Sequence, residues 1–294
     1  MTLLLRRRAA AVLILGLSVY VSLAAAQPLA PVQFETFLAR RFGHEGKPWD
    51  SQRFCPTETD IVAKRVLESY GSMFSASDSV TLPSVCIHDS EAPVLRFQKL
   101  LAAQRVEMSS PISLQAAAAN SLRVAIGEAV ERQMKISPLD GSIAGARSYG
   151  DTLMLWNSRV FPALNYWSRR GRLSPLDLDA LARLEPAKKV GKILEWENQG
   201  IYFSTDRSRS ILTSTAPPGS SQHLALIALD IVEYGNPEVR AILNRNGWYQ
   251  TIVDDPPHFT FLGHREDELP ARGLKLVYKG SYAFWIPNLT PQAD

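Results

Sequence analysis

The sequence places one acidic residue inside an apolar run that is otherwise suited to a protein core. Asp230 interrupts the segment LALIALDIV, which covers residues 224–232. An isolated buried carboxylate is costly unless it is paired or bound to a metal. His223 stands directly before this run, and His258 begins a second apolar segment. Two histidines and one carboxylate are a common set of Zn²⁺ ligands, with a fourth position left open for water. We therefore predict a zinc site at these three residues.

A second carboxylate lies next to the last of these candidate ligands. Asp255 precedes His258 by three residues, with Pro256 and Pro257 between them. Because proline fixes the backbone angle φ, the two side chains are held in a stiff arrangement. A carboxylate this close to a metal site can accept a proton from water, so Asp255 is the candidate general base. An aspartate before proline is also an ordinary turn former, so the hypothesis depends on the joint spacing of the residues.

The joint spacing resembles that of the vancomycin-resistance-type D-Ala-D-Ala metallocarboxypeptidases, a family related in fold to the hedgehog signalling domain. The family motif S-x-H-x-x-G-x-A-x-D is similar to SQHLALIALD, which ends at Asp230, and the later E-x-x-H is similar to DPPH, which ends at His258. The resemblance implies that His223, Asp230 and His258 bind Zn²⁺. It also implies that Asp255 stands where the catalytic glutamate stands.

Two departures from the family pattern bear on activity. Leu226 occupies the position of the motif glycine, so we expect the backbone and the pocket to differ there. Asp255 is one methylene shorter than glutamate, which could leave its carboxylate too far from the attacking water. Both departures are compatible with a protein that keeps the metal and has lost or changed the reaction.

A third resemblance concerns the substrate's terminal carboxylate, which the family binds with the arginine of an S-G-Y-R-S-Y-x-x-Q motif. Here the segment ARSYGDT contains Arg147, with Thr152 in place of the glutamine. A guanidinium group can bind a carboxylate through two parallel hydrogen bonds. Arg207 is the rival candidate, although it lies close in sequence to His223. The resemblance covers roughly residues 115–265, with an insertion between Arg147 and His223.

The first 26 residues have the pattern of a secretory signal peptide. Arg6, Arg7 and Arg8 form a basic start, an apolar run follows, and Ala24-Ala25-Ala26 supplies the small residues of a cleavage site. The run is nearly long enough to span a bilayer, so an uncleaved anchor is the alternative. We expect an exported protein, periplasmic or extracellular and associated with the cell envelope. No stable membrane span is expected after cleavage.

The charge balance and the cysteines narrow the function further. The three arginines of the signal segment account for the whole formal charge of +3, so residues 27–294 carry equal numbers of basic and acidic side chains. Such a balanced surface gives no basis for nucleic-acid binding, which needs a concentrated basic face. Cys55 and Cys86 are the two cysteines of the chain. An exported protein matures under oxidising conditions, so we predict one disulfide, with two free thiols as the alternative.

Hydrophobic periodicity and turn residues predict an α+β fold: a helical N-terminal region and a small, mostly antiparallel sheet that carries the zinc site. We divide the chain into the signal peptide at 1–26, a partly helical N-terminal region at 27–110, and a metallopeptidase-like domain at 111–294. Helices are expected from Thr57, over 91–101, over 112–134, over 149–167 and from Ser174, and a short one is capped by Asn236-Pro237 and ended by Gly247. Strands are expected within 193–212, over 224–232, 248–253 and 258–262, and in a final hairpin over 273–286.

Together these observations predict a zinc-dependent peptidase that acts on peptidoglycan stem peptides in the manner of a D-alanyl-D-alanine carboxypeptidase. An endopeptidase that cuts cross-bridges would need no clamp for a terminal carboxylate, and the sequence does not choose between the two. The alternative is a non-catalytic cell-wall-binding or scaffolding protein of the same fold with a degenerate metal site. No Ser-x-x-Lys occurs in the chain, which argues against a penicillin-binding-type serine peptidase.

The signal-peptide hypothesis makes a direct prediction. Protein recovered from the cell envelope should begin near Gln27, because the small residues before it fit the cleavage site. Mass spectrometry of the intact protein measures this. A protein that begins at Met1 and partitions with membranes would show that the segment is an anchor instead.

Overall fold

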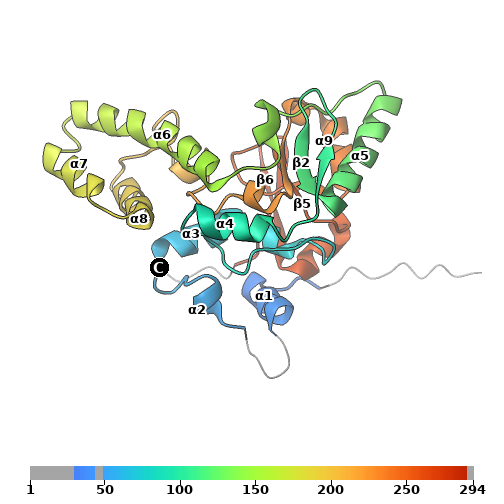
Figure 1. The fold of residues 1–294 in the computed structure, drawn as a ribbon, viewed down its shortest axis with the longest axis horizontal. Coiled ribbons are helices and arrows are strands. Elements are labelled where there is room, and N and C mark those ends of the chain that lie inside the picture. The colour runs from blue at the N-terminus through green and yellow to red at the C-terminus, as the bar shows by residue number, and fades with distance from the viewer. Residues whose placement is uncertain (1–29, 44–48, 290–294) are drawn as a thin grey trace, which may run out of the picture.

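The computed structural model describes residues 30–43 and 49–289 and confirms the α+β fold class. Helices surround three small antiparallel sheets (Figure 1). The predicted signal segment lies outside the described residues. Within the described ranges, no helix combines the length and the apolar character that crossing a membrane requires.

A three-stranded sheet with the order β3-β5-β4 positions the candidate site. Its strands are β3 (Ala228–Asp230), β5 (His258–Phe261) and β4 (Trp248–Gln250), and both pairings are antiparallel. The register places Asp230 directly opposite His258. Cβ atoms of directly opposed residues lie about 4.5–5.5 Å apart, so sheet pairing alone brings these two candidate ligands together.

The elements that connect these strands form largely as predicted. Asn236 caps α9 (Pro237–Arg245), with its side chain accepting a hydrogen bond from the Glu238 backbone. Gly247 follows with a φ of +77°, a left-handed conformation that favours glycine, and β4 begins at the next residue. The predicted C-terminal hairpin is confirmed as β6 (Leu274–Lys279) and β7 (Tyr282–Pro287).

The predicted helix over 112–134 is wrong at its start. Residues Ile112–Gln115 form the strand β2, which pairs with β1 (Ala103–Val106), and the helix α5 covers Ala116–Glu131. Ile112 and Leu114 are both buried, as alternate residues on one face of a strand are. The apolar helical stripe over 118–129 is confirmed. That stripe could not show that the residues before it, 112–115, pair with the distant segment β1.

The predicted strand over 224–232 is correct only in its second half. Residues Gln222–Ala225 form a 3₁₀ turn, η4, and Leu226 then adopts a left-handed conformation with φ 55° before β3 begins. The Leu226 backbone N–H donates to the His223 carbonyl, which closes the turn. An apolar run shows burial, and burial alone does not distinguish a strand from a buried turn.

The predicted strands within 193–212 are wrong. Residues up to Glu197 belong to helix α8 (Pro186–Glu197), and the following segment folds around the Glu197 carboxylate. That buried side chain accepts hydrogen bonds from the Phe203 and Ile211 backbones and from the Ser210 hydroxyl. In this segment the Glu197 carboxylate thus satisfies backbone N–H groups that would bond to a neighbouring strand in a sheet.

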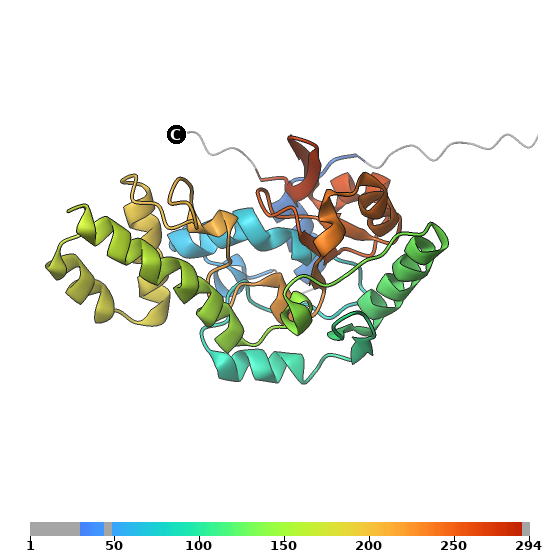
Figure 2. The same cartoon turned by 90° about the horizontal axis from the view of Figure 1, so that it is seen from above.

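Helices α6 (Tyr149–Arg169), α7 (Pro175–Ala182) and α8 form a lobe beside the sheets, which we call the helical lobe (Figures 1 and 2). Its first two helices begin as predicted, and each starts with a capping box in which a serine and an aspartate three residues later bind each other's backbone. The lobe coincides with the insertion inferred between Arg147 and His223.

The N-terminal helices pack against the rest of the chain. They are α1 (Phe34–Phe42), α2 (Ser51–Phe54), α3 (Ile61–Tyr70) and α4 (Glu91–Gln98). The helix expected from Thr57 begins instead at Ile61, because the Asp60 side chain accepts from the Val62 backbone at 2.7 Å and caps it. The Phe34 backbone donates to the carbonyl of Asn288, which ties the first described helix to the end of β7.

The predicted disulfide between Cys55 and Cys86 is confirmed, with a Cα–Cα distance of 5.3 Å. It joins the end of α2 to the loop before α4. The bridge therefore closes a loop of 31 residues that contains α3. Cross-linking of this kind stabilises the fold mainly because it restricts the unfolded chain.

Replacing both Cys55 and Cys86 with alanine should lower the free energy of unfolding by about 3–4 kcal/mol, the loop-closure effect expected for a loop of this length. Chemical denaturation with and without a reductant measures it. The reductant should destabilise the parent and leave the double variant unchanged. Equal stability of parent and double variant would contradict the prediction.

Candidate metal centre

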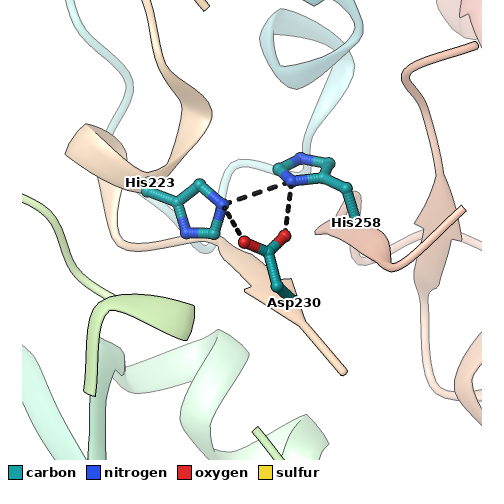
Figure 3. A group of neighbouring side chains, drawn as sticks. All are labelled: His223, Asp230 and His258. Atoms are coloured by element: carbon teal, nitrogen blue, oxygen red, sulfur yellow. Dashed lines mark hydrogen bonds and ion pairs between the residues drawn. The ribbon is translucent and has the colours of Figure 1, made fainter. Parts of the chain in front are cut away.

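The three candidate ligands converge as the sequence predicts. One ligand atom from each of His223, Asp230 and His258 lies within 4.8 Å of the other two. Figure 3 shows the side chains pointing toward one another, from η4, β3 and β5. His223 Nε2 lies 3.2 Å from His258 Nδ1, and the Asp230 carboxylate lies 3.0 Å from His258 Nδ1 and 3.4 Å from His223 Nε2.

The hydrogen bond that His223 makes on its outer side fixes its tautomer, and the tautomer decides which ring nitrogen has a lone pair. Its Nδ1 lies 2.7 Å from the carbonyl oxygen of Gly145. A carbonyl only accepts hydrogen bonds, so Nδ1 carries the proton. In the neutral imidazole Nε2 then has a free lone pair, and Nε2 is the atom that points at Asp230 and His258.

Gln222 does the same for His258. Its amide nitrogen donates to the Tyr70 carbonyl at 2.9 Å, so its oxygen, Oε1, faces His258 Nε2 at 2.9 Å. Thr260 and Thr251 also direct their hydroxyls at this oxygen. His258 Nε2 therefore carries a proton, and Nδ1 faces the cluster with its lone pair. Sequence reasoning missed Gln222, which is fully buried although it is polar and precedes a candidate ligand.

Two imidazole lone pairs and a carboxylate thus face one point, and such a set repels itself without a positive charge between its members. A proton on His258 Nδ1 would form a hydrogen bond to Asp230, but the lone pair of His223 Nε2 would then at best share that same proton. A divalent cation would serve all three atoms together. The outer hydrogen bonds are those that ligating histidines commonly make to fix ring orientation and tautomer. The donor set therefore fits Zn²⁺, which favours imidazole nitrogen and carboxylate oxygen.

The charges of the site agree with this arrangement. Burial, together with the nearby charge of Arg147, lowers the pKa of His223 to about 4. Burial opposes ionisation of Asp230, but the charge that His223 carries at low pH and the hydrogen bonds from its protonated form outweigh burial and hold the pKa of Asp230 well below its usual range. At neutral pH the site presents a neutral His223 and an ionised Asp230, which are the protonation states that metal binding requires.

Asp255 lines the same cleft as the three candidate ligands, a cavity of about 170 Å³. It sits in the turn between β4 and β5, where its carbonyl accepts from the His258 backbone at 3.1 Å. Asp254, the residue before it, has a φ of 71° and is paired with Lys279 and Arg209. Burial, with a further contribution from the Asp230 charge, raises the pKa of Asp255 to about 6.

The two arginine candidates are in different places. Arg147 lines the cleft, but its Nη2 donates to Asp230 at 2.5 Å and its Nε donates to the Ile143 carbonyl at 2.9 Å. Arg147 therefore orients a candidate ligand, and Nη1 is the part of its guanidinium without a hydrogen bond to the described residues. Arg207 does not line the cleft, and its guanidinium lies over the ring of Tyr166 at 4.7 Å.

The departure at Leu226 has a structural counterpart. The backbone there is left-handed, with φ 55° and ψ 35°, which is the conformation that glycine adopts without strain. A leucine in this region costs roughly 1–2 kcal/mol. Its side chain is buried in the core, which offsets part of that cost. The turn that brings His223 back toward β3 thus has the left-handed conformation that glycine favours, although leucine occupies the position.

Comparisons with known proteins give little beyond this geometry. No protein-family model matches the chain, and no curated protein matches it by sequence. Among solved structures it is similar to the vancomycin-resistance D,D-pentapeptidase VanY from a VanB-type resistance cassette, a mutant in complex with Zn(II), at a TM-score of 0.33 and 16% identity. The match covers 57% of this chain and 82% of that one.

Gln222→Leu should weaken Zn²⁺ binding about 10- to 100-fold, because His258 loses the acceptor that fixes its tautomer. Competition with a chelator of known affinity measures this. Gln222→Glu keeps an acceptor at the position and should retain more affinity. The matched control is Gln115→Leu, since Gln115 is also buried and fully hydrogen-bonded but does not line the cleft. Equal loss of zinc affinity in both leucine variants would refute the positioning role.

Proposed function

We propose that this protein is a zinc-dependent peptidase that hydrolyses peptide bonds in peptidoglycan stem peptides, in the manner of a D-alanyl-D-alanine carboxypeptidase. The observation that carries the proposal is the convergence of two imidazole lone pairs and a carboxylate on one point of a cleft. The choice of substrate rests on the resemblance of the motifs that end at Asp230 and His258.

Three protein ligands suit catalysis better than a purely structural role. Structural zinc sites are almost always closed by four protein ligands, whereas catalytic sites keep one position open. His223, Asp230 and His258 are three, and they line a cleft. When bound in such a site, zinc supplies Lewis acidity that polarises a carbonyl and acidifies water.

Asp255 acts as the general base in this proposal. It shares the cleft with the ligands, and its raised pKa of about 6 makes it a better proton acceptor than an exposed aspartate while it stays largely ionised at neutral pH. It takes a proton from the attacking water and delivers it to the leaving amine. Arg147 orients Asp230 through its ion pair, and its Nη1 remains available to a polar atom of the substrate.

The shorter side chain of Asp255 supports one alternative, a cell-wall-binding or scaffolding protein that retains the metal. An aspartate reaches about one carbon–carbon bond less far into the cleft than the glutamate it replaces. Asp255→Glu distinguishes the two functions. If the zinc-bound parent is inactive and Asp255→Glu hydrolyses the peptide, the result favours the alternative that the natural protein binds cell wall without catalysis.

Alanine substitution should separate ligands from base. His223→Ala, Asp230→Ala and His258→Ala should each abolish stoichiometric zinc and hydrolysis together, because each removes a ligand. Asp255→Ala should keep zinc and lower the turnover number by about 10²–10⁴-fold, the usual contribution of a general base.

Elemental analysis and cleavage of a D-Ala-D-Ala peptide measure these effects. Asp140→Ala is the control, since Asp140 lines the cleft but lies outside the cluster. Purified parent protein that binds no stoichiometric metal, with Asp230 held by Arg147 alone, would refute the proposed function.

A further inference from the structure

Arg159 brings a second positive charge to the cleft that holds the candidate ligands. It lies in the middle of α6, and both Arg159 and Leu155, one helical turn earlier, line the cleft. Residues four positions apart share one face of a helix. This face of the helical lobe therefore forms one wall of the cleft, and the sheet that carries Asp230 and His258 forms another.

One edge of the Arg159 guanidinium has no partner in the part of the chain that the structure describes. Nη1 donates to the Ser158 hydroxyl at 2.8 Å, whereas the buried Nε has no acceptor and Nη2 forms no hydrogen bond or ion pair there. The helix itself offers no acid three or four positions away, where Leu155, Trp156, Pro162 and Ala163 stand. Buried N–H groups without an acceptor are rare in folded proteins.

The other arginines near the site differ from Arg159. The charge of Arg147 is balanced by its 2.5 Å contact with Asp230. Arg207 also has a buried Nε without an acceptor, but it lies over Tyr166 outside the cleft lining. Arg159 therefore combines two properties, a place in the cleft wall and an Nε–Nη2 edge without a hydrogen bond to any described residue.

A hydroxyl donor lies in the same cleft. Thr215 is one of the lining residues, and its backbone N–H donates to Ile211 at 3.0 Å while its hydroxyl has no partner among the described residues. A hydroxyl can donate to a carboxylate oxygen that the guanidinium leaves free. In addition to the candidate ligands, the cleft thus holds donors that have no partner among the residues the structure describes.

We propose that Arg159 binds a carboxylate of the substrate through its Nε–Nη2 edge, with Thr215 as a further donor. The inference rests on the proposed peptidase function and deepens it, because it assigns the anionic end of the substrate to the helical lobe. The Nε and Nη2 groups form a planar fork that matches the two oxygens of a carboxylate. In a stem peptide this group is either the C-terminal carboxylate or an acidic side chain.

The test measures binding without catalysis, in the zinc-loaded Asp255→Ala protein. The probes are N-acetyl-L-Lys-D-Ala-D-Ala as the free acid, its C-terminal amide, and an amidated peptide with an acidic side chain. In this background Arg159→Gln should weaken binding of a carboxylate peptide roughly 10- to 100-fold, the effect of losing a charge-assisted hydrogen-bonded pair. Binding of the amide without an acidic side chain should not change, and zinc content should not change.

Arg169→Gln is the matched control, because Arg169 is exposed at the end of the same helix. Arg159→Lys keeps the charge without the fork and should give an intermediate loss. A loss confined to the free acid identifies the C-terminal carboxylate, and a loss confined to the acidic side-chain peptide identifies that side chain. The assignment would be overturned if Arg159→Gln weakened binding of all three peptides equally or weakened none of them. It would also be overturned if the zinc-loaded Asp255→Ala protein with Arg159 intact bound none of the peptides. Failure of the peptidase function appears separately, as peptides that bind to the zinc-loaded parent but are not cleaved.

Discussion

The two outer hydrogen bonds of the histidines are the constraint on which the candidate site depends. The Gly145 carbonyl and the Gln222 side-chain oxygen each accept a hydrogen bond from the outer N–H of one imidazole, so both inner nitrogens present lone pairs to Asp230. Neither acceptor can reverse its role, since a carbonyl has no proton to give and the Gln222 amide is fixed by Tyr70. A cation is the natural complement of this arrangement.

Several neighbouring elements hold the two histidines and their hydrogen-bond acceptors in place. The left-handed turn at Leu226 returns the chain from His223 to β3, and the β3–β5 register then sets Asp230 against His258. Thr251 and Thr260 direct their hydroxyls at the same oxygen of Gln222 and limit its movement. The site is thus built on a short sheet and one turn, elements whose backbones are fixed by pairing and burial.

The helical lobe adds a different kind of group to the cleft. The sheet and η4 supply the ligands, and the turn after β4 supplies Asp255. The lobe supplies Arg159, a cation without an acid partner in the described chain, while Arg147 is already engaged with Asp230. This division separates the groups that would hold a metal and move a proton from the group that is proposed to recognise the substrate.

The sequence by itself determined the candidate ligands and the elements with strong local signals. An aspartate inside an apolar run needs a partner wherever it lies, and caps such as Ser148, Ser174 and Asn236 fix helix starts through contacts within a few residues. Tertiary structure decided what depends on distant segments. The pairing of β2 with β1, the folding of residues 198–212 around Glu197, the role of Gln222 and the pairing of Arg147 with Asp230 all join groups whose partners no local pattern identifies. Hydrophobic periodicity reports which side chains are buried, whereas a buried polar group is satisfied by whichever partner the folded chain brings within hydrogen-bonding distance.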